Sequence, residues 1–168
     1  MHSSQGRIIQ KNNKADESIA LTMKNKPYNI LLADDNRNMF NLMKSAFELG
    51  EFHGELRWVQ DGQELIDYLL RQGNYSNAHS APLPDLILLD WNMPYKDGRE
   101  TLQALKTDPL LRNFPVIILS HSELDEDRQA ALELGADGYL LKPGRFSDLI
   151  DMIQNLEEKL IQGGSGRN

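Results

Sequence analysis

The chain has 168 residues, of which 40% are hydrophobic and 26% are charged, values typical of a folded globular protein. Its net charge of −7 argues against a domain that grips a nucleic-acid backbone on its own. The absence of cysteine excludes disulfides, thiolate metal sites and cysteine nucleophiles. No apolar stretch approaches the roughly 20 residues of a membrane span, and the N-terminus lacks the apolar core of a secretory signal. We therefore expect a cytoplasmic protein.

The two ends of the chain differ in composition from the region between them. Residues 1–26 carry five basic and two acidic side chains and few large apolar ones, so we expect a disordered leader. Residues 162–168 are rich in glycine and predict a flexible tail. One folded domain is expected over residues 27–161. Because residues 162–168 are too few to form an effector domain, we expect the output of the folded domain to pass through protein contacts.

Within this region, short apolar runs alternate with amphipathic helical patterns. The runs predict strands, and apolar residues three and four positions apart predict helices. In chain order these are strand 30–33, helix 38–49, strand 56–59, a helix around 65–70, strand 86–89, helix 99–106, strand 116–119, helix 126–134, strand 139–141 and helix 146–160. Because the strands are apolar throughout, the pattern predicts an α/β fold whose parallel sheet is covered on both faces.

Polar residues follow four of the predicted strands: Asp34 and Asp35, Asp90, Ser120, and Lys142. Doubly wound sheets bind ligands at the carboxyl ends of their strands, so these side chains are expected to converge. Three carboxylates at one edge repel one another, and Mg²⁺, which prefers oxygen ligands, relieves that repulsion. An aspartate beside such a cation can act as a nucleophile toward phosphorus, while a lysine and a hydroxyl bind the phosphoryl oxygens.

Each of these residues also has a purely structural interpretation. Asp34 and Asp35 could cap the helix that follows, and Asp90 could open a turn. Ser120 could be an ordinary cap or turn residue, and Lys142 could be a solvated surface lysine. A phosphoryl-transfer site is favoured because all of them fall at strand ends of one doubly wound pattern.

The segments at these strand ends closely resemble the CheY-like receiver domain of two-component response regulators. They are residues 31–36 (LLADDN), 88–94 (LLDWNMP) with Asp97-Gly98 behind them, 118–120 (ILS) and 135–143 (GADGYLLKP). The resemblance covers residues 28–161 and implies a flavodoxin-like, doubly wound, five-stranded parallel sheet with strand order 2-1-3-4-5. The long segment before Pro84-Asp85 and the run 97–100 are similar, more narrowly, to single-domain regulators paired with phytochrome histidine kinases.

This resemblance implies a phosphorylation-controlled switch in a two-component phosphorelay. Asp90 is expected to accept the phosphoryl group from the phosphohistidine of a sensor histidine kinase. Asp34 and Asp35 are expected to hold Mg²⁺, with Asp90 and the backbone carbonyl of Asn92 completing the protein ligands.

The resemblance also assigns the residues around the phosphate. Lys142 is expected to pair with the phosphoryl oxygens, through a Lys142–Pro143 peptide bond in the cis form. Ser120 is the hydroxyl expected to move toward the phosphate, and Tyr139 is the aromatic residue expected to swing inward with it. Tyr139 could instead be a half-buried strand residue.

Two residues depart from the family pattern. His121 stands where a small residue is common, and its ring would narrow access to an aspartyl phosphate. Gly144 stands where a larger apolar residue is frequent, and it would loosen the start of the last helix.

We expect no turnover enzyme, only slow Mg²⁺-dependent autodephosphorylation. One alternative is an aspartate-nucleophile phosphatase or hydrolase, which usually needs a second acid–base group and a substrate-enclosing cap. Another is a receiver-like binding module that is never phosphorylated, against which the intact Asp90 and Lys142 argue. The expected partners are a sensor kinase, a downstream protein and a second copy of the chain through the face of the last helix, with no direct nucleic-acid or membrane contact.

Overall fold

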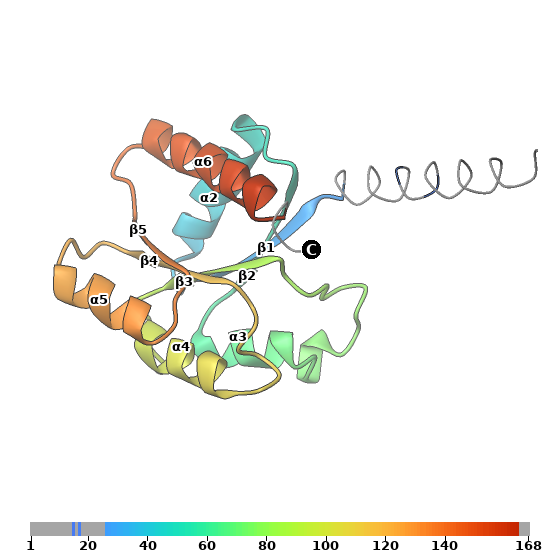
Figure 1. Cartoon of the computed structure of the whole chain (residues 1–168), viewed down its shortest axis with the longest axis vertical. Coiled ribbons are helices and arrows are strands. Elements are labelled where there is room, and N and C mark those ends of the chain that lie inside the picture. Colours follow the sequence, from blue (N-terminus) through green and yellow to red (C-terminus); the bar gives the residue numbers. More distant parts are fainter. Residues whose placement is uncertain (1–14, 16, 18–25, 165–168) are drawn as a thin grey trace, which may run out of the picture.

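The computed structural model describes residues 15, 17 and 26–164 and confirms the predicted α/β fold. Within this part of the chain, five parallel strands form one sheet in the order β2-β1-β3-β4-β5, as the resemblance implied (Figure 1). The strands are β1 (Tyr28–Ala33), β2 (Gly54–Val59), β3 (Leu86–Asp90), β4 (Val116–Ser120) and β5 (Gly138–Leu141). The helices are α2 (Arg37–Leu49), α3 (Gly62–Leu69), α4 (Gly98–Thr107), α5 (Asp125–Glu133) and α6 (Phe146–Gly164). None of the helices described combines the length and the apolarity that a bilayer crossing requires.

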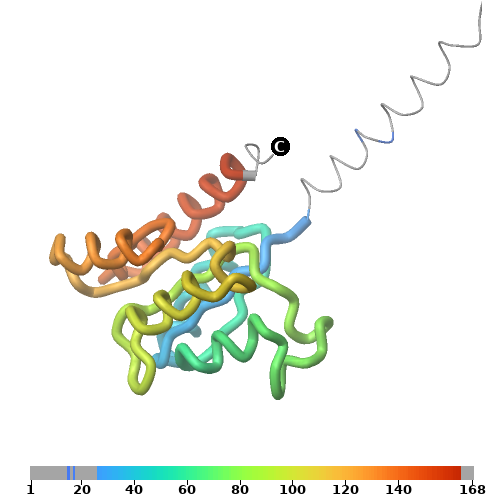
Figure 2. The backbone as a smooth tube through the Cα atoms, turned by 60° about the horizontal axis from the view of Figure 1, so that its bottom comes forward, coloured from blue at the N-terminus to red at the C-terminus, as the bar shows by residue number. Residues whose placement is uncertain are grey.

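Helices cover both faces of the sheet. α2 and α6 pack on one face, and α3, α4 and α5 pack on the other (Figures 1 and 2). Strand side chains alternate between these layers: in β1, Leu31 faces the second layer, whereas Ile30 and Leu32 face the first. All three are at most 1% exposed, which is why a doubly covered strand has an unbroken apolar sequence.

Most elements begin and end within two residues of their predicted positions. β1 and β2 begin earlier, because the Tyr28 N–H donates to the His53 carbonyl at 3.0 Å and pairs the starts of both strands. The prediction for the C-terminal tail is wrong in part, since α6 continues to Gly164 and residues 162–164 are helical. A glycine costs a helix only about 1 kcal/mol relative to alanine, so Gly163 does not stop it. Of the predicted leader only residues 15, 17 and 26 are described, and residues 165–168 also lie outside the described residues.

The segment between α3 and β3 is held against α3 by contacts of two tyrosines. It contains a short 3₁₀ turn, η1 (Gly73–Tyr75), and lies at the opposite end of the molecule from α5 (Figures 1 and 2). The Tyr75 ring lies 4.9 Å from the Tyr68 ring, and its hydroxyl donates to Glu64. Burial and this bond raise the pKa of Tyr75. The Tyr68 hydroxyl donates to the Pro82 carbonyl at 2.9 Å and ties down the far end of the loop.

The start of α4 lies directly against the backbone of β3. The Gly98 N–H donates to the Trp91 carbonyl at 3.1 Å. A Cβ at Gly98 would clash with the Asp90 carbonyl oxygen and would lie only 2.6 Å from the Trp91 Cα. Only a residue without a side chain permits this approach, so Gly98 allows α4 to support the residue at the end of β3.

Replacing Gly98 by alanine is therefore expected to lower the free energy of unfolding by about 1–3 kcal/mol, because the added methyl group displaces the backbone of Asp90 or of α4. Urea unfolding followed by circular dichroism measures the change. Gly144→Ala is the matched control, since a Cβ at Gly144 would meet open space. Equal unfolding midpoints for the two variants would contradict the expectation.

Candidate functional site

The carboxyl ends of the strands bring the predicted polar residues to one edge of the sheet. They are Asp34 and Asp35 after β1, Asp90 at the end of β3, Ser120 at the end of β4 and Lys142 after β5. Asp34, Asp90 and Ser120 are buried, whereas Asp35 is exposed. Buried polar side chains need partners, and the contacts of each one indicate what the site can bind.

Lys142 lies between two carboxylates. Its Nζ is 2.9 Å from Asp34 Oδ2 and 3.0 Å from Asp90 Oδ1, and its side chain is 6% exposed. Burial alone would lower the pKa of Lys142, but the bond to Asp34 and the charges of Asp34 and Asp90 outweigh burial and raise it. The Lys142 side chain is therefore buried and charged, and the interpretation as a solvated surface lysine is wrong.

The three aspartates form a compact acidic cluster. Among the residues described, Asp34, Asp35 and Asp90 are the one group of three or more whose ligand atoms lie within 4.8 Å of one another. Burial raises the pKa of Asp90, the Lys142 charge lowers it, and the Asp34 charge raises it again, with a net rise. A cluster of carboxylate oxygens with one exposed member suits a hard divalent cation that keeps part of its water shell.

The predicted alternative that Asp34 or Asp35 caps the next helix is wrong. Asn36 caps α2, with its Oδ1 accepting from the N–H groups of Asn38 and Met39 at 2.9 and 3.3 Å. The Asp34 Oδ1 instead accepts from the Asn36 N–H at 2.8 Å, inside the turn. Because Asn36 satisfies the helix start, both aspartates are available to the acidic cluster.

The turn after β3 lies beside the same cluster. The Asn92 N–H donates to Asp90 Oδ1 at 3.3 Å, so Asp90 does open a turn as well as facing Lys142. This bond holds Asn92, the fourth predicted ligand residue, next to the acidic cluster. The neighbouring Trp91 is 6% exposed and has the Arg99 guanidinium 5.5 Å from its ring centroid.

Ser120 and Tyr139 are linked through a residue that the sequence analysis did not identify. The Ser122 N–H donates to Ser120 Oγ at 3.0 Å, and the Ser122 carbonyl accepts from the Tyr139 hydroxyl at 2.9 Å. The Ser122 hydroxyl in turn donates to Asp127 Oδ2 at 2.5 Å, in the first turn of α5. Tyr139 is 7% exposed, with the Arg128 guanidinium 5.3 Å from its ring centroid. Ser122 therefore connects the buried hydroxyl to both Tyr139 and α5.

The predicted cis bond between Lys142 and Pro143 is wrong. No peptide bond among the described residues is cis, so this bond is trans. The trans form of an X–Pro bond is favoured by about 0.5–1 kcal/mol, so the cis form is expected only where the contacts of the neighbouring residue cannot form with a trans bond. Here the Lys142 N–H reaches the Ser120 carbonyl at 2.8 Å, and the Lys142 Nζ reaches both carboxylates, with a trans bond.

The sequence analysis did not identify two of the residues that hold this site. Trp58, in β2, donates from its Nε1 to the Asp34 carbonyl at 2.7 Å, and no motif marks it. Ser122 lies two residues after Ser120, and only this spacing hinted at a turn that returns to the Ser120 hydroxyl.

Comparison with known proteins gives consistent matches over the same region. A family model described as the response regulator receiver domain matches residues 30–154. The response regulator Rcp1 of Synechocystis sp. is 38% identical over 133 residues, which cover 79% of this chain and 88% of Rcp1.

Two solved structures share the fold and about a third of the sequence. The crystal structure of the phosphorylated cyanobacterial phytochrome response regulator RcpA has a TM-score of 0.72 at 36% identity, covering 82% of this chain and 96% of RcpA. The crystal structure of the Mn²⁺-bound form of response regulator Rcp1 has a TM-score of 0.69 at 35% identity, covering 81% of this chain and 96% of that one.

Replacing Lys142 by alanine is expected to lower stability in EDTA by about 3 kcal/mol, because Asp34 and Asp90 then share a buried site without a cation. Mg²⁺ is expected to restore part of the loss, since it binds the folded cluster and supplies the missing positive charge. Urea unfolding in EDTA and in Mg²⁺ tests both expectations. If Lys142→Ala in EDTA unfolds at the wild-type midpoint, the buried ion pairs do not stabilise this edge of the sheet.

Proposed function

This chain belongs to the response regulator receiver domain family, as its sequence predicted, and we propose that it is a single-domain regulator phosphorylated on Asp90. The observation that carries the proposal is the position of the Asp90 carboxylate. It lies at the end of β3, 3.0 Å from the Lys142 ammonium group and beside two further carboxylates. In the proposed step, an Asp90 oxygen bonds to phosphorus as the bond between phosphorus and the kinase histidine breaks, and the imidazole leaves with the electron pair.

Receiver domains bind Mg²⁺ through acidic residues, and this chain has the corresponding acidic cluster. We propose that Asp34, Asp35 and Asp90 hold the ion together with the carbonyl of Asn92. When bound, Mg²⁺ neutralises negative charge on the transferring phosphoryl group. Lys142 already faces Asp90 and would pair with a phosphoryl oxygen, exchanging a carboxylate contact for a phosphate contact.

Conformational change is proposed to start at Ser120. Its Oγ now accepts from the Ser122 N–H, and a turn of this hydroxyl toward the phosphoryl oxygens would end that bond. Ser122 also holds the Tyr139 hydroxyl and, through Asp127, the start of α5. A displacement of Ser122 would thus reach Tyr139 and α5 together, so both would differ between the two phosphorylation states.

The proposed phosphate donor is a histidine kinase, and the relatives narrow its class. The matched RcpA is named a phytochrome response regulator, which favours a phytochrome kinase as the partner in the cytoplasm. Receiver domains in general are not turnover enzymes, and family membership favours a switch over the phosphatase or hydrolase alternative. Slow Mg²⁺-dependent autodephosphorylation of Asp90 is part of the proposal.

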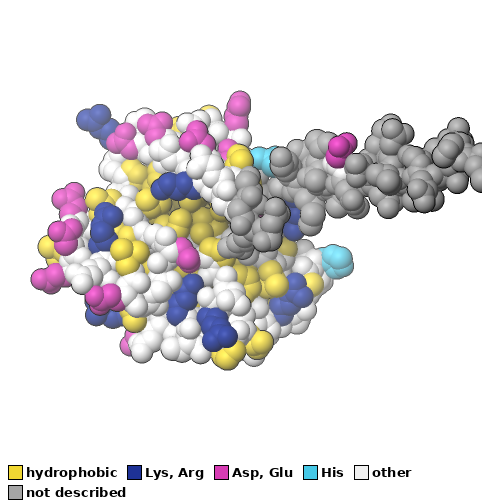
Figure 3. Space-filling view, viewed as in Figure 1, with side chains coloured by type: hydrophobic (Ala, Val, Ile, Leu, Met, Phe, Trp, Pro, Cys, Tyr) yellow, Lys and Arg dark blue, Asp and Glu magenta, His cyan; other side chains and the backbone are white. Residues whose placement is uncertain are grey.

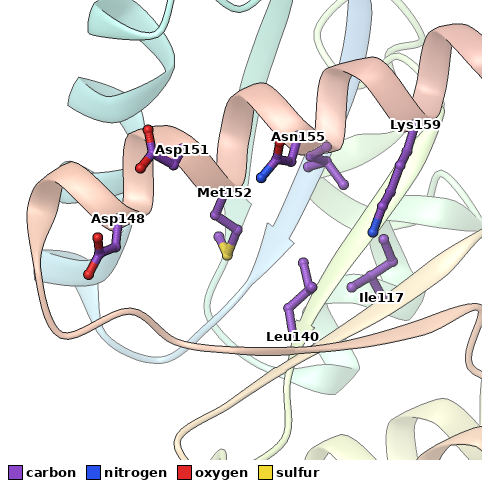
Figure 4. Close-up of a pocket in the computed structure, with 8 residues that line it drawn as sticks. Ile117, Leu140, Asp148, Asp151, Met152, Asn155 and Lys159 are labelled. Carbon is purple, nitrogen blue, oxygen red and sulfur yellow. The ribbon is translucent and has the colours of Figure 1, made fainter.

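The proposed output surface is a groove between α6 and strands β4 and β5. It has a volume of about 310 Å³, and the floor includes Ile117, Leu140 and Met152 (Figure 4). Hydrophobic side chains gather in a hollow on this face of the molecule (Figure 3). A second groove, which also includes Ile117, extends the apolar surface toward Tyr28. An apolar groove flanked by charged side chains suits contact with a protein partner.

We propose that the partner is a second copy of the chain, because the charges along the groove complement each other under two-fold symmetry. Asp148 and Asp151 lie toward the start of α6, and Lys159 lies further along the helix (Figure 4). Lys159 follows Asp151 by eight residues, a rise of about 12 Å. In a two-fold pair with antiparallel α6 helices, each Lys159 faces the acidic end of the other copy. Gln154, also in α6, does not line this groove: its Cγ lies 3.6 Å from where a Cβ on Gly50 would stand.

Phosphorylation is expected at Asp90 alone and only with Mg²⁺. Incubation with acetyl phosphate, followed by a phosphate-affinity gel, should give one shifted band that EDTA removes. Asp90→Asn is expected to remove the band. Asp85→Asn, at the residue directly before β3, is the control that keeps it. A shifted band that survives in Asp90→Asn would disprove the assignment.

Sedimentation velocity with and without beryllofluoride tests the homodimer. The unaltered chain is expected to dimerise more tightly with beryllofluoride, and Met152→Glu is expected to weaken the dimer at least tenfold because it buries a charge in the apolar groove. Gln154→Glu is the matched control and is expected to keep the dimer. A monomer under all conditions, or a dimer insensitive to Met152→Glu, would exclude this interface.

A further inference from the structure

We propose that Trp58 is a positioning residue for the acidic cluster, acting through the hydrogen bond from its indole Nε1 to the Asp34 carbonyl. The proposal rests on the proposed function of the cluster as a Mg²⁺ site and adds to it a residue from β2, a strand that contributes no ligand. Mg²⁺ affinity should therefore depend on a side chain that touches neither the ion nor the phosphate.

The first step of the argument is the end of the strand pairing. The register of β1 and β2 ends at the pair Ala33 and Val59. The Asp34 N–H still donates to the Val59 carbonyl at 3.1 Å, but the Asp34 carbonyl lies beyond the ladder. Trp58 Nε1 donates to this carbonyl at 2.7 Å, so a side chain continues the hydrogen bonding that the β2 backbone no longer supplies.

The second step is the rigidity of the peptide group. The Asp34 carbonyl belongs to the planar peptide unit that ends at the Asp35 Cα. Fixing this carbonyl fixes the plane and limits where the exposed Asp35 carboxylate can point. Asp34 is further held through its side chain, by the Asn36 N–H at 2.8 Å and by Lys142 at 2.9 Å. Trp58 is thus the contact that acts on the link between the two aspartates.

The third step is that Trp58 is itself held in place. Its ring is stacked on Phe40 with centroids 5.2 Å apart and an interplanar angle of 10°. The Arg37 guanidinium lies 5.8 Å from the ring centroid. Both contacts come from the first turns of α2, directly after the turn that Trp58 holds. The indole is therefore fixed relative to the segment that it orients.

These contacts separate a positioning role from a packing role. Octahedral Mg²⁺ coordination tolerates little displacement of its ligands, so a looser Asp34–Asp35 peptide should weaken binding. Trp58→Phe keeps an aromatic ring against Phe40 but removes the N–H donor. Phe40→Leu removes the stacked ring but keeps the donor. A packing role predicts that both substitutions act alike, and a positioning role predicts that only the first changes metal affinity.

The experiment is a Mg²⁺ titration of the full chain and both variants, followed by tryptophan fluorescence. The chain has two tryptophans, so Trp58→Phe leaves Trp91 as its single tryptophan. We expect a Kd for Mg²⁺ that is five- to tenfold weaker in Trp58→Phe and within twofold of the unaltered chain in Phe40→Leu. Equal Kd values for Trp58→Phe and the unaltered chain, or equal weakening in both variants, would overturn the proposal.

A second measurement observes the Trp58 indole N–H directly, first in the unaltered chain without the metal. In the metal-free unaltered chain, the Trp58 indole proton should exchange with solvent at least tenfold more slowly than in a short Trp-containing peptide. Mg²⁺ should shift its ¹⁵N–¹H signal with the same Kd as the fluorescence. Rapid exchange would overturn the proposal, while an Asp35→Asn variant that binds Mg²⁺ as well as the unaltered chain would overturn the proposed metal site instead.

Discussion

The contacts of Lys142 with Asp34 and Asp90 are the interaction on which the rest of the site depends. A buried carboxylate is costly without a partner, and here two of them share one ammonium group within 3.0 Å. The three residues follow or end three different strands, so the pairs form only when β1, β3 and β5 are all in register. One ammonium group cannot neutralise three carboxylates, so the cluster keeps an excess of negative charge. A divalent cation can therefore bind there as well.

The packing around this cluster keeps its parts at fixed positions. Two helical layers bury the side chains at the carboxyl ends of β1, β3 and β4, and Gly98 lets α4 approach the backbone of Asp90. Asn36 satisfies the start of α2 and so releases both aspartates from a capping role. Each of these features fixes a segment of the backbone, which limits the conformations that the attached polar side chains can adopt. A preorganised site of this kind spends little energy on rearrangement when it binds its ligand.

The site is connected to the rest of the molecule on two sides. Ser122 links the Ser120 hydroxyl to Tyr139 and to the first turn of α5. On the other side, Lys142 directly follows β5, whose Leu140 forms part of the groove beside α6. A change in charge at Asp90 therefore acts on residues that are one or two contacts away from α5 and from the groove beside α6. For the proposed phosphorylation of Asp90, this closeness offers a physical route to an altered protein contact.

The sequence by itself determined the order of elements, the parallel sheet and the residues that meet at its edge. Unbroken apolar runs reveal doubly covered strands, and topology then carries Asp34, Asp90 and Lys142 to one place. Only the tertiary structure decided that Asn36 caps α2, that the Lys142–Pro143 bond is trans, that Trp58 holds Asp34, and that Gln154 faces away from the groove. These features depend on register, side-chain rotamers and helix rotation. Packing between segments distant in the chain sets all three, and no local pattern encodes them.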